Sequence, residues 1–331
     1  MKIVSDASVN TDQPLLSSPW LKFWFHAEPG IQSLVGIRAG LSLIACWYFA
    51  SHWVDAGTWF SVDGILATER LGDFLDAGDL ADDAKWRVSP LYLLSSTTAL
   101  RCYLAIGIML AIAAVMIRTS RAPAILLWLW CLWLANRSLL IAGPEELALV
   151  FGLAYLTIPK PNDTRLCFKR GLTPSGKARN TTKNDLPPKG QTPFKTEPSH
   201  WTHALARRLL QVHMALLLAA TGLTMLASKI WWDGTGSVSI AAPIGRRVFD
   251  FTDLLTSPWI HESLTHAIVV VPIAASIMVW LPATRLHAYL AAMIWCVVLA
   301  LLSSQWMYLA TIVVLLQCFN TKREPATLDR N

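Results

Sequence analysis

A lysine followed by aromatic and acidic residues is the arrangement in this sequence with the clearest capacity for chemistry. Lys229 stands at the end of an apolar run, and Trp231, Trp232, Asp233 and Gly234 follow it closely. Burial against indole rings would lower the proton affinity of the lysine, whereas a neighbouring carboxylate would raise it. Lys229 is therefore our candidate for a general base. The alternative is an anchor at the membrane–water interface, where tryptophan gathers and long cationic side chains reach the headgroups.

Four other ionisable residues lie in or close to apolar runs, where a charge is costly and marks a candidate binding site. Arg38 either extends toward lipid headgroups or binds a ligand. Arg137 and Glu145 flank a short turn, where they form a structural ion pair or belong to a site. His213 lies inside a later apolar run, and a hydrogen-bonded core histidine is the alternative to a binding role.

No metal site is expected from the histidines and cysteines. His261 and His266 are five residues apart, which rotates them by about 140° around a helix, whereas a zinc helix needs histidines four apart on one face. The six cysteines form no CxxC pair. Both patterns therefore argue against a zinc centre.

The composition indicates a membrane protein. The chain has 331 residues, of which 54% are hydrophobic and 15% charged, and its mean hydropathy is +0.42. Soluble domains carry about 25% charged residues. The 16 tryptophans suit a protein with many membrane–water interfaces. We expect an all-α, multi-pass helical bundle in a bacterial inner or cell membrane.

Eight apolar runs are predicted to be transmembrane helices, since a span needs roughly 20 apolar residues. They cover about 31–54, 100–117, 124–141, 146–158, 209–230, 264–281, 286–302 and 306–319. The predicted organisation is a polar segment at 1–30, helices at 31–159, a linker at 160–204, helices at 205–319 and a tail at 320–331. The linker has almost no aliphatic residues, so we expect it to be disordered.

The charges of the connections predict the orientation. The stretch Asp55–Ser89 holds eight acidic and three basic residues, whereas Lys160–Arg208 holds three acidic and eleven basic residues. Positive charge stays on the cytoplasmic side, which places both termini in the cytoplasm if there are eight spans. The basic linker suits anionic lipid headgroups. It lacks interleaved aromatic residues, so nucleic acid is not an expected partner.

Short motifs along the chain together resemble a known family. They are Ile37-Arg38, Val62-Asp63-Gly64-Ile65-Leu66, Ser89-Pro90-Leu91, Thr119–Arg121, Asn136-Arg137 and the block from Gln211 through Gly222 to Thr235. In this order the chain resembles the HTTM family, the membrane domain shared with vitamin K-dependent gamma-carboxylases, from roughly Trp20 to Phe319. The resemblance implies a non-cytoplasmic active site, a vitamin K-like reduced quinone as cofactor, and a lysine base that deprotonates it.

The sequence departs from the carboxylase pattern in two respects. Counted back from the Trp-Trp-Asp-Gly block, the lysine of the family falls on Met225, which cannot accept a proton. Lys229 is one helical turn further on and would share that face. The carboxylases also carry a large soluble domain that holds the protein substrate, and this chain has no such stretch after its last span, so its protein substrate is unknown.

Three functions stay open on this basis. The first is an HTTM-type membrane protein that acts on a reduced quinone at the outer face. The second is a non-enzymatic membrane protein that binds a quinone or a lipid. The third is a transporter, which is less favoured because the ionisable residues cluster near the two faces and not near the midplane.

The predicted orientation can be tested by cysteine labelling. In an otherwise cysteine-free chain, a membrane-impermeant maleimide should label a cysteine placed at Asp76 in intact cells. A cysteine placed at Lys183 should react only after the cells are opened, because positive-inside charge keeps that segment in the cytoplasm. The reverse labelling pattern would contradict the eight-span arrangement.

Overall fold

The computed structural model describes residues 18–25, 31–77, 89–117, 120–138, 143–159, 201–241, 251 and 256–319, and every regular element within them is a helix. This confirms the all-α prediction for the described part of the chain. Residues 1–17, 160–200 and 320–331 hold most of the predicted N-terminal segment, linker and tail, and they lie outside the described residues.

The described helices, in chain order, are α1 (Pro19–Phe25), α2 (Ile31–Phe60), α3 (Thr68–Ala77), η1 (Pro90–Leu93), α5 (Thr97–Met116), α6 (Ala122–Arg137), α7 (Pro144–Leu156), α9 (Trp201–Leu226), α10 (Lys229–Trp232), α11 (Gly236–Ile240), α13 (Pro258–Met278), α14 (Arg285–Ser303), α15 (Trp306–Leu316) and η4 (Gln317–Phe319).

Five of these helices are long and apolar enough to cross a membrane. They are Leu34–Phe60 within α2, and α5, α9, α13 and α14. Their outward faces carry large apolar side chains, including Leu43 of α2, Met109 of α5 and Leu216 of α9, which are 60–63% exposed. Apolar surface on several neighbouring helices marks a surface that meets lipid or protein. The chain therefore has the build of an integral membrane protein.

Several boundaries differ from those predicted from hydropathy. Helix α2 continues to Phe60, because Ala56 and Phe60 are buried and extend its packed face beyond the polar residues around Asp55. Helix α9 begins at Trp201, so the last four residues of the predicted linker, 201–204, are helical. Helix α1 lies within the segment predicted as polar, and its Phe23 ring packs against Trp280 at a centroid distance of 6.0 Å.

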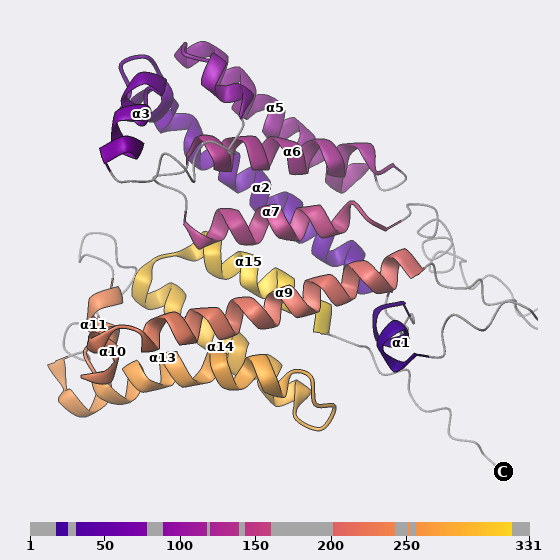
Figure 1. Cartoon of the computed structure of the whole chain (residues 1–331), viewed down its shortest axis with the longest axis vertical. Helices are drawn as coiled ribbons and strands as arrows, with labels where there is room; N and C mark the ends of the chain where they lie inside the picture. Colours follow the sequence, from indigo (N-terminus) through magenta and orange to yellow (C-terminus); the bar gives the residue numbers. More distant parts are fainter. Residues whose placement is uncertain are drawn as a thin grey trace, which may run out of the picture.

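Three further helices are shorter than a standard span. Helix α6 has 16 residues, α7 has 13 and α15 has 11. All three pack within the bundle: α6 contacts α5 and α7, and α15 contacts α2, α7, α9 and α14. Figure 1 shows the long and short helices side by side, with successive members of the series α2, α5, α6, α7, α9, α13, α14 and α15 running in opposite directions.

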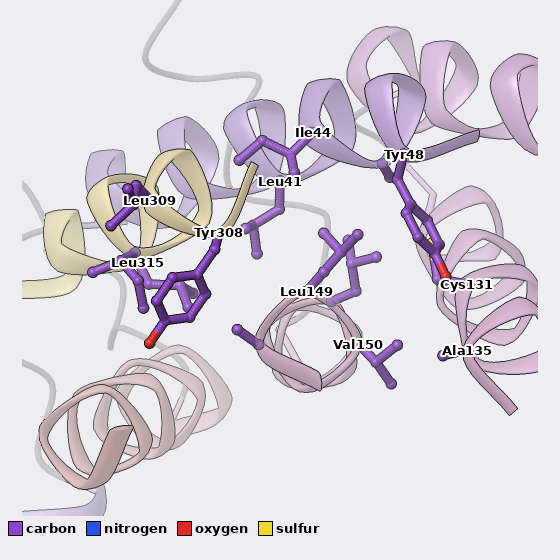
Figure 2. Close-up of a cluster of buried hydrophobic side chains, with 14 of the residues drawn as sticks. Leu41, Ile44, Tyr48, Cys131, Ala135, Leu149, Val150, Tyr308, Leu309 and Leu315 are labelled. Carbon is purple, nitrogen blue, oxygen red and sulfur yellow. The ribbon is translucent and has the colours of Figure 1, made fainter. Parts of the chain in front are cut away.

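Helix α2 lies at the centre of the N-terminal half. It packs against α5, α7 and α15, and Leu41, Tyr48 and Phe49 on it are fully buried. Figure 2 shows Tyr48 pointing toward Cys131 of α6, while Leu41 and Ile44 face α7 and α15. In the C-terminal half α13 packs against α9 and α14. The Tyr308 hydroxyl of α15 meets that of Thr221 on α9 at 3.2 Å. Since α15 also contacts α2 and α7, it connects the two halves.

Arginine side chains bind backbone carbonyls at the C-terminal ends of four helices. Arg38 donates to the carbonyls of Ala114 and Ile117 at the end of α5, with nitrogen–oxygen distances of 3.2 and 3.1 Å. The other contacts are those of Arg121 with Pro159 after α7, Arg285 with Val279 after α13, and Arg207 with Cys318 after α15. The last carbonyls of a helix lack partners within the helix, so cationic donors stabilise these ends.

The contact between α9 and α13 depends on a glycine. A Cβ atom at Gly222 would lie 2.9 Å from the backbone oxygen of Val269, whereas at Gly36 of α2 it would meet nothing within 4 Å. A backbone atom cannot move aside as a side chain can. We expect Gly222→Ala to destabilise the purified protein by about 1–3 kcal/mol through overpacking.

Gly36→Ala is the matched control. It should leave the thermal unfolding temperature unchanged or raise it, because alanine is the better helix former. Equal unfolding temperatures for the two variants would show that α9 and α13 do not approach this closely.

Candidate functional site

A pocket lies where the end of α2, the start of α3 and the segment after η1 meet. Its volume is about 340 Å³, and it is lined by Phe60, Ser61, Val62, Ala67, Thr68, Tyr92, Leu93 and Ser95. Aromatic and apolar side chains with a few hydroxyl groups are the usual lining of a small-molecule site, and the volume falls in the range of such sites. We take this pocket as the candidate binding site and call it the outer pocket after the predicted orientation.

Hydrogen bonds fix the η1 wall of the outer pocket. The Ser89 hydroxyl donates to the Trp133 carbonyl at 2.7 Å, and the Tyr92 hydroxyl donates to the Asn136 carbonyl at 3.1 Å, so η1 is held against the end of α6. The Thr68 hydroxyl donates to the Tyr92 carbonyl at 3.3 Å, which connects α3 to the same wall. The Val62 N–H donates to the Ser95 carbonyl at 3.2 Å and joins the two sides of the pocket.

Arg137 lies directly behind this wall. Its side chain is fully buried in the last turn of α6. The guanidinium carbon lies 5.0 Å from the centre of the Tyr92 ring and 5.7 Å from that of Phe60. None of its three guanidinium nitrogens has a hydrogen-bond partner within the described part of the chain. Arg137 and Phe60 also line a second, partly open pocket of about 10 Å³.

The turn that follows α9 differs from the surroundings of Arg137, because most of its predicted site residues are exposed. Lys229 opens α10 and is exposed to the surroundings, as are Trp232 and Asp233. Trp231 is buried and packs on Gly236 of α11. The indole N–H of Trp232 donates to the Leu226 carbonyl at 2.8 Å, which fixes α10 against the end of α9.

Thr265 of α13 holds this turn in place. Its hydroxyl oxygen accepts from the Ser237 N–H at 3.0 Å. The same hydroxyl lies 2.8 Å from the Gly234 carbonyl oxygen and 2.7 Å from that of His261, and its proton serves one of them at a time. Gly234 adopts a φ of 76°, which favours glycine at this position. The Trp-Trp-Asp-Gly block therefore forms a structural turn docked on α13.

Two other predicted site residues, Arg38 and His213, lie neither at the outer pocket nor in the turn after α9. Arg38 caps α5 at the opposite end of its span. His213 lies half-buried between α9 and α7, with Nδ1 3.4 Å from the Tyr155 hydroxyl and its ring 4.8 Å from that of Phe151.

The acidic residues that open α7 do not pair with Arg137. Glu146 accepts from the Gly143 N–H at 2.6 Å and so caps its own helix. The guanidinium nitrogens of Arg137 form no hydrogen bond to any described carboxylate, that of Glu145 included. The structural ion pair that the sequence suggested for Arg137 and Glu145 is therefore not formed.

The predicted residues are thus divided between two places. Figure 1 shows α3, α10 and α11 at the same end of the bundle. Helix α10 contacts α9, α11 and α13, whereas Arg137 belongs to α6, which contacts η1. Sequence reasoning missed Phe60, Tyr92 and Thr265. The Val62 and Ser89 motifs were the available signal for the pocket, since their segments form its two sides.

Removing the Thr265 hydroxyl should loosen this turn. Thr265→Val keeps the shape but leaves the buried Ser237 N–H without its acceptor, which costs about 1–3 kcal/mol. We expect a lower thermal unfolding temperature and faster hydrogen exchange in residues 231–241. Thr224→Val, at an exposed threonine whose hydroxyl bonds only within α9, is the control. Similar losses in both variants would mean that Thr265 does not hold the turn.

No group of three or more His, Cys, Asp or Glu side chains in the described part of the chain is placed to hold a metal ion. Comparisons of the chain with protein-family models, with curated proteins and with solved structures find no match.

Proposed function

We propose that the chain is an eight-span membrane protein of the HTTM type, with cytoplasmic termini, that binds a reduced quinone at its non-cytoplasmic end. The outer pocket carries this proposal. Its aromatic and apolar lining, with four hydroxyl groups, suits a flat ring that bears two oxygen atoms. The sequence resemblance to the carboxylase membrane domain supports the same class of ligand.

The eight-span arrangement draws support from the three shorter helices. At 1.5 Å per residue α6 is about 24 Å long and α7 about 20 Å, which falls short of a core of about 30 Å. Each nevertheless packs beside full-length spans and alternates with them in direction. Local thinning of the bilayer and the turns at their ends make up such a mismatch at modest cost.

Binding without catalysis is the form of this function that the geometry favours. A lysine that serves as a base needs a partly dry environment to lose its proton. Lys229 is exposed, and its helix packs in the C-terminal half, away from η1 and α3. Met225, at the position of the family's lysine, is half-buried against the core. A quinone-dependent enzyme that uses Lys229 is the second candidate.

Truncating the exposed pocket lining should weaken quinone binding. Val62 and Leu93 are 64% and 85% exposed, so shortening them spares the core. We expect Val62→Ala/Leu93→Ala to raise the Kd for a short-chain naphthohydroquinone at least tenfold in nanodiscs kept free of oxygen, because two apolar contacts with the ligand are lost. Val238→Ala/Leu286→Ala, also at exposed apolar positions, is the matched control.

Lys229→Met distinguishes quinone binding alone from catalysis by Lys229, in the same nanodisc preparation. If the protein only binds, this variant keeps the wild-type Kd, and neither protein oxidises the quinol above the lipid background. Turnover by the wild type that falls by about 10²–10⁴ in Lys229→Met would instead establish Lys229 as a base. Absence of saturable binding to the wild type would overturn the quinone proposal altogether.

A further inference from the structure

Charged groups mark both ends of α7, and they are too close together for a bilayer of ordinary thickness. Glu145 stands in the first turn. Beyond the last turn, the Nε atom of Arg121 donates to the Pro159 carbonyl at 2.8 Å. At 1.5 Å per residue the stretch from Glu145 to Pro159 is at most about 21 Å long, whereas a hydrocarbon core is about 30 Å thick. Helix α9, which contacts α7, has 26 residues and is about 39 Å long. The apolar belt around the bundle is therefore narrow at α7.

One face of α7 is open to the surroundings. Leu147 and Phe151 are 55% and 42% exposed, and Tyr155 is half-buried. Residues four apart share a helix face, so these three side chains form a row along α7. Large exposed apolar side chains in a membrane-spanning helix meet the acyl chains of lipids. The row therefore shows how much of α7 is suited to hydrocarbon.

A polar pair ends the apolar part of this row. The Tyr155 hydroxyl lies 3.4 Å from Nδ1 of His213, a half-buried residue in the middle of α9. The Phe151 ring lies 4.8 Å from the His213 ring and completes the cluster. Half-exposed polar groups are costly in hydrocarbon, where no water can bond them. The pair therefore indicates a level that headgroups reach, only about 12 Å along α7 from Leu147.

The chemistry of the pair suits a phospholipid headgroup. When the Tyr155 hydroxyl donates to Nδ1 of His213, a neutral imidazole carries its hydrogen on Nε2. The pair then offers an N–H donor. Phosphate and ester oxygens of a phospholipid are acceptors for such a donor.

We propose that the open face of α7 contacts a locally thinned bilayer, in which phospholipid headgroups of the inner leaflet reach Tyr155 and His213. The inner leaflet follows from the orientation, because Tyr155 stands in the last turn of α7, which ends on the cytoplasmic side. The inference rests on the eight-span arrangement proposed above. It does not depend on which ligand the outer pocket binds.

The experiment is a thermal unfolding series on the full chain, without added quinone, in nanodiscs of phosphatidylcholines with monounsaturated chains of 14 to 22 carbons. Each ångström of mismatch carries a modest cost, so the unfolding temperature is highest where the lipid matches the protein. We expect the wild type to unfold about 2–4 °C higher with chains of 14–16 carbons than with chains of 20–22 carbons. A wild-type optimum at 18 or more carbons would overturn the proposal, whether or not any variant folds.

Tyr155→Phe/His213→Leu makes the whole row apolar and should move the optimum to chains about two to four carbons longer. His287→Leu/Tyr289→Phe is the matched control. It removes the same two polar groups near the start of α14, whose 19 residues span about 28 Å and already fit the core. The control should keep the wild-type optimum.

An unchanged optimum in Tyr155→Phe/His213→Leu would contradict the assignment of the pair to the headgroup level. Equal shifts in both double variants would contradict it as well, because the effect would then not be specific to α7. Cysteine labelling at Asp76 and Lys183 tests the eight spans separately. The expected labelling together with a wild-type optimum at long chains would overturn the thinned bilayer alone.

Discussion

Helix ends that lack backbone partners are the constraint on which this structure depends, and arginine side chains satisfy many of them. In a bilayer an unpaired carbonyl cannot accept a hydrogen bond from water. The C-terminus of each helix therefore needs another hydrogen-bond donor. Arg38, Arg121, Arg207 and Arg285 supply donors to the ends of α5, α7, α15 and α13, in that order, from other segments or from the following turn. Gln211 adds a second donor to the Cys318 carbonyl at 3.0 Å. Each arginine contact also favours the helix dipole, because a cation sits at its negative end.

The helix ends that arginine side chains cap lie together at one end of the bundle. Helices α5, α7, α13 and α15 all end on the side where Figure 1 shows α1. In the predicted orientation, the basic residues of the cytoplasmic connections thus include arginines that complete these helix ends. The opposite end carries α3, η1, α10 and α11 instead. Hydroxyl groups such as those of Ser89 and Thr265 tie that end together and leave room for a pocket.

Hydropathy predicted the positions of the apolar helices because the apolar residues of each helix form one continuous run in the sequence. It placed the end of α2 too early and the start of α9 too late, since tertiary packing of Phe60 and of Ala204 extends both helices past polar residues. The site was harder to predict. Phe60 and Tyr92 meet only because η1 docks on α6, and no local pattern encodes a contact between residues so far apart. The Trp-Trp-Asp-Gly block suggested chemistry, yet Thr265, which has no sequence signal, makes it a structural turn.

Arg137 differs from the capping arginines in a way that the same physics explains. It sits in the last turn of its own helix, where its charge favours the dipole of α6, but its buried side chain bonds to no carbonyl in the described part of the chain. A dipole contributes roughly 0.3–1 kcal/mol at an exposed position and up to about 2 kcal/mol when partly buried. The desolvation of a cation costs several kcal/mol. The dipole and the two rings therefore hold the guanidinium in position, although its nitrogens form no hydrogen bond within the described part of the chain.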